Sequence, residues 1–336
     1  MNQMKSLLPL PSNTNMPATD EPVVAVVIPC YRVVPHICEV IAGIGKEVAN
    51  IYCVDDCCPD GSGRHIEINC HDTRVAVLIN SHNLGVGGAT MAGYQRALHD
   101  GNQIIVKIDG DGQMDPALIS RFVRSIILSR ADYTKGNRFF KPESLRNMPT
   151  SRLLGNAILS CITKLSTGYW QAMDPTNGYT AIHSRVLELL PLEKISARYF
   201  FESDMLFRLN TIGAIIEDIP MDAVYGSEQS NLKIHKIFGE FLFKHWVNFI
   251  KRILYNYFLR NFSIASVELV VGLTLFSFGL VFGIFKWLES TNTGIPVTAG
   301  TVMLASLPVI LGIQLLLSFL AYDIRNFPQV PLHKRL

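Results

Sequence analysis

The chain has 336 residues, of which 49% are hydrophobic, and its formal net charge at pH 7 is +2. This length can bury a sizeable core, as one large domain with an appendage or as two modest domains. A charge so near zero gives no electrostatic argument for nucleic acid as a partner.

The first part of the chain predicts a tail followed by an α/β domain. Residues 1–21 are rich in Pro, Ser, Thr and Asn and lack a signal-peptide core, so we expect a disordered tail. Strands then alternate with helices, which favours a mostly parallel sheet whose ligands lie beyond the carboxyl ends of the strands. We predict strands at 23–29, 51–54, 75–79, 104–108, 132–137, 174–183 and 215–220, and helices at 36–48, 64–69, 89–100, 151–165 and 200–209.

An acidic cluster directly follows the apolar run 104–108. It contains Asp109 and Asp111, with Gln113 two residues further on and a glycine between each pair. Turns at these glycines allow both carboxylates to converge on one ion. Hard oxygen ligands suit Mg²⁺ or Mn²⁺, which proteins usually share with substrate phosphates. We therefore predict a metal site formed by Asp109, Asp111 and Gln113.

Two further polar segments stand at the ends of predicted strands. Asp55 and Asp56 end the second strand, where a carboxylate can accept hydrogen bonds from a nucleobase or a ribose. The alternative is a cap for the turn that follows. The glycine-rich segment 83–89 leads into a helix and predicts either a wall of a phosphate pocket or close packing.

The carboxyl-terminal part predicts a membrane anchor. Residues 263–285 and 301–322 contain only one charged side chain, Glu268, and each run can span a bilayer about 30 Å thick. Two buried helices of a soluble core are the alternative. The short connector makes the pair a hairpin, and the positive-inside rule places both ends in the cytoplasm. The cations that flank the hairpin are Lys244, Lys251, Arg252, Arg260, Arg325, Lys334 and Arg335.

Cations alternate with aromatic and aliphatic residues before the hairpin, which predicts helices lying in the membrane interface. An ordinary surface helix is the alternative. The expected organisation is a tail at 1–21, a catalytic domain at 22–231, interfacial amphipathic helices at 232–262, a transmembrane hairpin at 263–322 and a cytoplasmic tail at 323–336.

Five stretches together resemble family 2 glycosyltransferases with the GT-A fold, and more closely the membrane-anchored polyprenyl-phosphate sugar synthases. The resemblance covers about residues 23–322 and departs from the usual pattern at Cys57-Cys58, where Gly-Ser is common. It implies a Rossmann-like, mostly parallel sheet with a carboxyl-terminal two-helix transmembrane hairpin. The stretches are VVIPCYR, VDDCCPDGSG, NLGVGGATMAGYQRAL, KIDGDGQMDP, and DPTNGY with the later FFESD.

The resemblance implies an inverting, metal-dependent enzyme of the cytoplasmic membrane that moves a sugar from a nucleotide-diphosphate sugar to a polyprenyl phosphate. A UDP-sugar is favoured over GDP-mannose, and a homo-oligomer is possible. Asp109, Asp111, Arg138 and Arg152 would form the catalytic set, with the two arginines on the acceptor phosphate. The donor would contact Pro29, Tyr31, Asp55, Asn83, Gly85, Asp109 and Lys233, and the sugar or acceptor would contact Asn156, Asp174, Glu202 and Asp204.

Three alternatives stay open. The acceptor could be another lipid or a glycan, or the chain could be a non-catalytic membrane adaptor that binds nucleotide. A processive polysaccharide synthase would carry a Gln-x-x-Arg-Trp motif, and no tryptophan of this chain follows an arginine.

Overall fold

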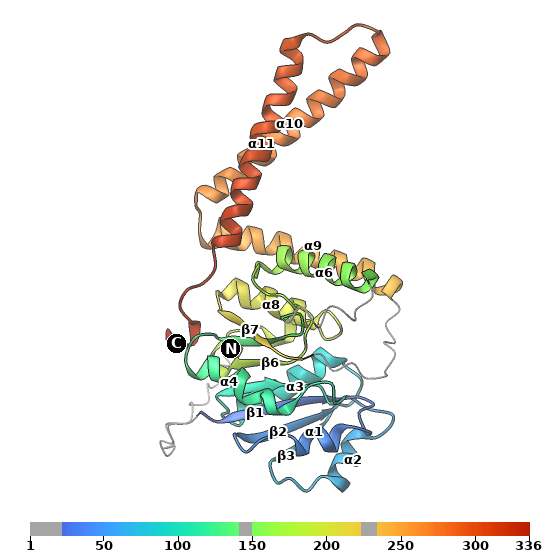
Figure 1. Ribbon diagram of the computed structural model, residues 1–336, viewed down its shortest axis with the longest axis vertical. Coiled ribbons are helices and arrows are strands. Elements are labelled where there is room, and N and C mark those ends of the chain that lie inside the picture. Colours follow the sequence, from blue (N-terminus) through green and yellow to red (C-terminus); the bar gives the residue numbers. More distant parts are fainter. Residues whose placement is uncertain (1–21, 141–149, 223–233) are drawn as a thin grey trace, which may run out of the picture.

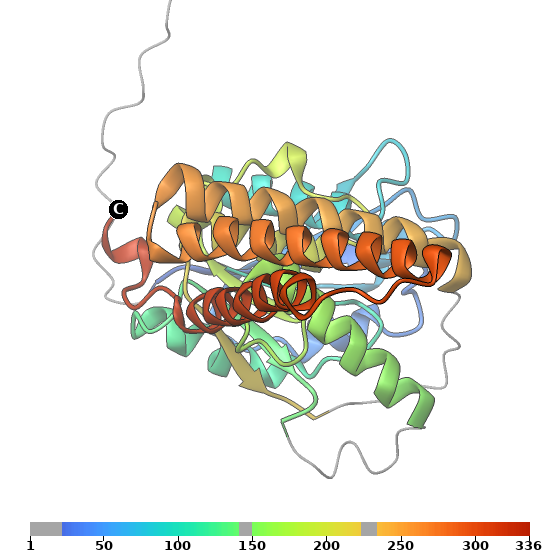
Figure 2. The same cartoon turned by 90° about the horizontal axis from the view of Figure 1, so that it is seen from above.

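The computed structural model describes residues 22–140, 150–222 and 234–336. It has three levels: a domain built on a sheet, two long helices that lie across that domain, and a helical hairpin that points away from it (Figure 1). Viewed from above, the hairpin stands over the domain (Figure 2). The crossing helices are α6 (Thr150–Thr167) and α9 (Ile234–Leu254), and the hairpin is α10 (Ile264–Thr293) with α11 (Ala299–Arg325).

A seven-stranded sheet, in the order β3-β2-β1-β4-β6-β5-β7, forms the centre of the domain. All its pairings are parallel except those of β6, which runs antiparallel to β4 and β5. This confirms the α/β fold with a mostly parallel sheet. The strands are β1 (Val24–Cys30), β2 (Val48–Asp55), β3 (Val75–Ile79), β4 (Ile104–Lys107), β5 (Tyr133–Asn137), β6 (Thr180–His183) and β7 (Ile216–Pro220).

Helices cover both faces of the sheet. Every residue of β1 is buried although its side chains point alternately to opposite faces, so both faces must be covered. Val26 and Ile28 belong to one core cluster, and Ala25 and Val27 belong to the other. The first cluster includes residues of α1 (Ile37–Ala42) and α4 (Ile119–Ile127). The second includes residues of α3 (Val86–His99), α7 (Ser184–Glu188) and α8 (Phe201–Ile212).

Several boundaries differ from the sequence-based expectation. The strand expected at 174–183 begins only at Thr180. The helix expected at 36–48 ends at Ala42, because Gly43 and Gly45 interrupt it and β2 already begins at Val48. The helix expected at 64–69 is α2 (Ser62–Asn69), and α3 begins at Val86 within the glycine-rich segment. The alternation itself is as predicted.

The hairpin helices are long and apolar enough to cross a membrane. Each has a window of mean hydropathy 2.2, and only 11% of that window is buried. Such exposure contradicts the alternative of two buried core helices. The helices approach closely at glycines: a Cβ on Gly279 would lie 2.6 Å from the carbonyl oxygen of Ala305, and one on Gly312 would lie 2.6 Å from the amide nitrogen of Phe276. Small residues at such contacts are typical of membrane helix pairs.

A buried ionic cluster joins the hairpin to the domain. Asp323, near the end of α11, receives a bidentate contact from Arg252 of α9, with N–O distances of 2.6 and 3.0 Å. Tyr257 and Trp170 also donate to the same carboxylate. Arg252 donates further to the carbonyl oxygen of Leu165 on α6. Three segments that are far apart in sequence, 165–170, 252–257 and the end of α11, therefore meet at this cluster.

The chain then returns to the catalytic domain. The short helix η4 (Leu332–Lys334) docks on Asp132, a fully buried residue at the start of β5. Asp132 accepts hydrogen bonds from the backbone of Leu332 and from the backbone and ring of His333, whose ring stacks on His183 at 4.5 Å. Residues 332–334 are thus a docked segment, whereas the sequence predicted a simple tail from residue 323.

Candidate active site

Chemically active side chains gather at one edge of the sheet. The carboxyl ends of β1, β2, β4 and β5 lie at the same edge, because these strands all run in the same direction. The loop before β6 ends at this edge as well, since β6 runs the opposite way. This edge therefore receives the residues after Cys30, Asp55, Lys107 and Asn137, together with the segment 174–179.

Asp55 is the candidate contact for the nucleoside of a donor. Its carboxylate accepts hydrogen bonds from the backbone N–H of Cys58 at 2.7 Å and of Gly63 at 2.6 Å. It therefore holds the turn before α2, as the capping alternative expected, and is only 6% exposed. Tyr31 is 45% exposed at the end of β1, whereas Pro29 is buried within that strand. A direct contact between a donor and the Pro29 ring therefore has no support in this geometry.

Asp56 has a structural environment. Its carboxylate accepts hydrogen bonds from the side chain of Asn80 and from the backbone N–H of Leu84 and Gly85, at 2.7 to 2.9 Å. Asn83 donates to the backbone oxygen of Asp56. Asp56 consequently fixes the approach to α3.

The glycines of this approach are required for packing. A Cβ on Gly85 would lie 2.7 Å from the carbonyl oxygen of Ala197, and one on Gly87 would lie 2.4 Å from that of Ser196. Gly85 also has a φ of +85°, which side chains rarely adopt. Both glycines face a neighbouring protein segment, which favours the packing interpretation over a pocket wall.

The acidic cluster lies where β4 ends. The Asp109 side chain is 28% exposed, and Asp111 and Gln113 are half-buried. The backbone N–H of Gln113 donates to Asp111 at 3.0 Å, which closes the turn. Within the described residues no three His, Cys, Asp or Glu side chains group as a metal site. Two carboxylates and one amide oxygen still suit a divalent cation that is completed by diphosphate oxygens.

A buried lysine stands behind this cluster. Lys107 is 0% exposed, and its Nζ lies 2.7 Å from Oδ1 of Asp109 and 3.8 Å from Oε1 of Glu202 on α8. Burial opposes the charge, but Asp109 and Glu202 together raise the pKa of Lys107, so its ammonium stays protonated. Burial also raises the pKa of Glu202, against the opposing effect of Lys107.

A second ion pair, two strands from β4, joins a partly exposed arginine to a buried aspartate. Arg138, directly after β5, contacts Asp174 with both arms, at 2.7 and 3.0 Å. Asn177 donates to the same carboxylate at 3.2 Å. Burial alone would raise the pKa of Asp174, yet Arg138 holds it below its usual range. Asp174 is 0% exposed, so it orients Arg138 and does not itself face a ligand.

Asp204 differs from the sequence-based expectation of a sugar contact. One carboxylate oxygen accepts from the backbone of Ser196 and from Arg208, and the other accepts from Asn248 of α9. Protein donors thus occupy both oxygens of a side chain that is 5% exposed. The physical role that these contacts support is the attachment of α9 to α8.

Three predicted residues lie away from this geometry or outside the described part. Asn156 is half-buried on α6. Arg152 belongs to the first turns of α6, but its side chain is not among those described, and Lys233 falls in the undescribed segment 223–233.

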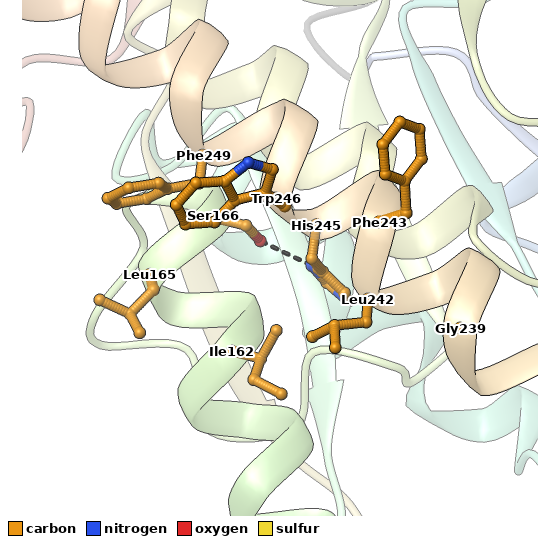
Figure 3. Close-up of a pocket in the computed structure, with 9 residues that line it drawn as sticks. All are labelled: Ile162, Leu165, Ser166, Gly239, Leu242, Phe243, His245, Trp246 and Phe249. Carbon is orange, nitrogen blue, oxygen red and sulfur yellow. Dashed lines mark hydrogen bonds between the residues drawn. The ribbon is translucent and has the colours of Figure 1, made fainter.

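An apolar groove runs between α6 and α9 (Figure 3). It encloses about 570 Å³, and its single polar pair is the hydrogen bond of 2.7 Å between Ser166 and Nδ1 of His245. Both helices also expose large apolar side chains. If α9 contacts lipid, α6 beside it would present a second apolar surface to the same lipid. These exposed residues are Leu153, Leu154 and Ile158 on α6, and Leu242, Phe243, Trp246, Ile250 and Leu254 on α9.

Sequence reasoning missed Lys107 and Gly178. A lysine inside an otherwise apolar strand, two residues before the acidic cluster, was an available signal. Gly178 had none, because its role is spatial: a Cβ there would lie 2.5 Å from Nζ of Lys107 and 2.8 Å from Oδ2 of Asp109.

Comparisons with known proteins agree with this geometry. Residues 25–190 match the model of the family described as glycosyl transferase family 2. The chain is 32% identical over 152 residues to the UDP-N-acetylglucosamine–dolichyl-phosphate N-acetylglucosaminyltransferase of Methanococcus voltae, covering 45% of this chain and 60% of that protein. It is 29% identical over 205 residues to the undecaprenyl-phosphate mannosyltransferase of Micrococcus luteus, covering 60% and 83%.

Among solved structures, the fold is similar to that of glucosyl-3-phosphoglycerate synthase from Mycobacterium tuberculosis in complex with Mn²⁺, UDP and glucosyl-3-phosphoglycerate. The TM-score is 0.52 at 15% identity, and the match covers 73% of this chain and 88% of the other. At this identity the likeness supports the fold.

Proposed function

We propose that this chain, whose residues 25–190 match the glycosyl transferase family 2 model, transfers a sugar from a nucleotide-diphosphate sugar to a polyprenyl phosphate. The observation that supports this most strongly is the pair Asp109 and Asp111 at the end of the central strand β4, with Asp55 on one side and Arg138 on the other. The names of the relatives in Methanococcus and Micrococcus support the same acceptor class.

Each side chain has a role that its chemistry supports. Asp55 already accepts one backbone hydrogen bond at each oxygen, and it is proposed to accept a further one from the nucleoside through a remaining lone pair. Asp109, Asp111 and Gln113 would hold a divalent cation, which neutralises the negative charge that builds on the leaving diphosphate. Arg138 would bind the acceptor phosphate, and Arg152 and Lys233 are proposed as further cations for acceptor and donor. A phosphate acceptor is already ionised, so Glu202 is proposed to position the sugar and no general base is required.

The proposed transfer inverts the configuration at the anomeric carbon, because the acceptor oxygen attacks this carbon from the face opposite the diphosphate. A UDP-sugar is the favoured donor, supported by the name of the Methanococcus relative and by the UDP and Mn²⁺ bound in the similar structure.

The hairpin is proposed to hold the site at the cytoplasmic face of the membrane. The chain leaves the domain through α9 and returns to it at η4, so both ends of the hairpin lie on the side of the domain. The apolar groove between α6 and α9 and the exposed apolar side chains beside it support contact with lipid. Fixing the domain at the membrane raises the effective concentration of a lipid acceptor.

A panel of UDP- and GDP-sugars, incubated with membranes that contain the protein and undecaprenyl phosphate, tests the proposal. The expected product is undecaprenyl phosphate heavier by one glycosyl residue, with the nucleoside diphosphate released; its formation should be lost with EDTA and restored by Mn²⁺ or Mg²⁺. Sugar transferred to another lipid or to a glycan would replace the acceptor in the proposal. Nucleotide binding without any transfer would favour an adaptor.

A further inference from the structure

Lys107 stands in a place that the fold alone does not explain. It pairs in register with Val27 of β1 and Thr180 of β6, in the middle of the sheet, and it is fully buried. Burying an ammonium and its partner costs stability that an aliphatic side chain in the same strand would not cost. Such a cost suggests that the charge serves the neighbouring site.

The contacts of the ammonium divide the Asp109 carboxylate into two unequal oxygens. Oδ1 lies 2.7 Å from Nζ of Lys107. Oδ2 lies on the side of Gly178, where a Cβ would come within 2.8 Å of it, so only a glycine leaves room there. One oxygen is therefore engaged by an internal cation, and the other lies beside the small space that Gly178 leaves.

We infer that Lys107 is a positioning residue that keeps Oδ1 of Asp109 engaged, so that Asp109 offers a cation only its second oxygen, Oδ2. This inference rests on the proposed function. The ammonium also lies within 3.8 Å of Glu202, so one side chain fixes a carboxylate of β4 relative to a carboxylate of α8. Its positive charge weakens cation binding at Asp109 and thereby eases release of the cation with the product diphosphate.

The test measures Mn²⁺ binding to the full-length protein in detergent, by electron paramagnetic resonance at saturating UDP, beside steady-state turnover. Lys107→Met removes the competing charge, so the Kd for Mn²⁺ should fall about tenfold, equivalent to roughly 1.4 kcal/mol. The kcat should fall at least tenfold, since Asp109 is no longer held in place. A lysine that only supports the fold would instead weaken Mn²⁺ binding and turnover together.

A double-mutant cycle identifies the partner. In the Asp109→Asn background, Lys107→Met should leave the Kd for Mn²⁺ unchanged, because the interaction is already lost. Lys135→Met is the matched control: Lys135 is equally buried on β5, two strands away, and donates to the backbone oxygens of Gly136 and Asp174. Its removal should not tighten Mn²⁺ binding.

Lys107→Gln covers the case in which the Met variant does not fold, because an amide can still donate to Oδ1 without the charge. It should tighten Mn²⁺ binding while keeping more turnover than the Met variant. An unchanged or higher Kd in both variants, or equal tightening in the Asp109→Asn background, would overturn the inference. If the wild-type protein shows no UDP-dependent Mn²⁺ binding, the proposed function itself fails. If the wild type binds Mn²⁺ and only the Lys107 variants behave differently from the expectation, the inference about Lys107 fails and the proposed function stands.

Discussion

Aspartates at the carboxyl edge of the sheet have two kinds of environment. The carboxylates of Asp56 and Asp204 are occupied by protein donors, and both side chains are buried. Asp109 is partly exposed and paired with Lys107, and Asp111 is half-buried. All four residues are aspartates, so residue type alone does not distinguish them, whereas burial and the surrounding donors do.

Asp111→Asn should abolish sugar transfer while the melting temperature stays near that of the wild type, because a neutral amide is a poor partner for a dication. Asp56→Asn is the matched comparison. It should lower the free energy of unfolding by about 2 kcal/mol, since two backbone N–H groups lose a charged acceptor. Turnover and thermal unfolding measured on both variants check the pair, and transfer at wild-type rate by Asp111→Asn would refute the metal assignment.

His245 should make stability depend on pH. Burial lowers its pKa to about 4, from about 6.5 in an unfolded chain. The unfolded state binds the proton more readily, so the stabilisation is complete above about pH 6.5 and is lost as the pH falls toward 4. The free energy of unfolding, measured at several pH values across this range, should depend less steeply on pH in His245→Phe than in the wild type. An identical slope in the variant would mean that other groups control the acid transition.

The sequence predicted correctly that the acidic cluster follows a buried strand, because strand, turn and carboxylates are adjacent in the chain, and the metal site itself stays a prediction. It could not predict that Asp204 contacts Asn248, because 44 residues separate the partners. Lys107 was missed for a related reason: the value of a charge in a strand depends on what lies opposite, here Glu202 on a distant helix.

At the scale of elements, the strands were predicted more reliably than the helix ends. β-branched runs identify buried strands directly, whereas α1 is cut short by glycines whose effect depends on the path of β2. The glycine-rich approach to α3 shows the same limit. Its composition permits contact with phosphate, but the segment 196–197 occupies the space at Gly85 and Gly87.

The junction of α9 with α11 depends on one buried ion pair. Arg252→Met leaves Asp323 buried without its cation, so the free energy of unfolding in detergent should fall by roughly 3 to 5 kcal/mol. The double variant Arg252→Met with Asp323→Leu should recover part of that loss. Lys286→Met, which breaks the exposed pair with Glu289, should change stability by less than about 1 kcal/mol. Equal losses in the buried and exposed pairs would contradict this account.

At the scale of the whole molecule, the apolar runs were enough to predict an α/β domain followed by two long apolar helices, whereas the placement of α9 in a membrane interface stays a prediction. The docking of η4 was not predictable, because Asp132 and His333 are separated by 201 residues and neither belongs to a recognisable motif.

The hairpin is attached to the domain on both sides, through Arg252 of α9 and through the return of the chain to Asp132, so a change in its tilt within a bilayer would move the domain as well. At 1.5 Å per residue, α10 and α11 are about 45 and 40 Å long, more than a hydrocarbon core of about 30 Å. A bilayer of different thickness changes the tilt of such helices. With the domain attached at both ends, that tilt turns the active site relative to the lipid surface.

Sugar transfer should therefore peak at one acyl-chain length in proteoliposomes and fall several-fold in thinner and thicker bilayers. A variant lacking residues 331–336 keeps the link through α9 but loses the second attachment, so its activity should vary less with thickness. Turnover of a short, soluble prenyl phosphate in detergent normalises both proteins. Matching thickness profiles would mean that a single attachment already transmits the tilt, and that the enzyme senses its membrane through α9 alone.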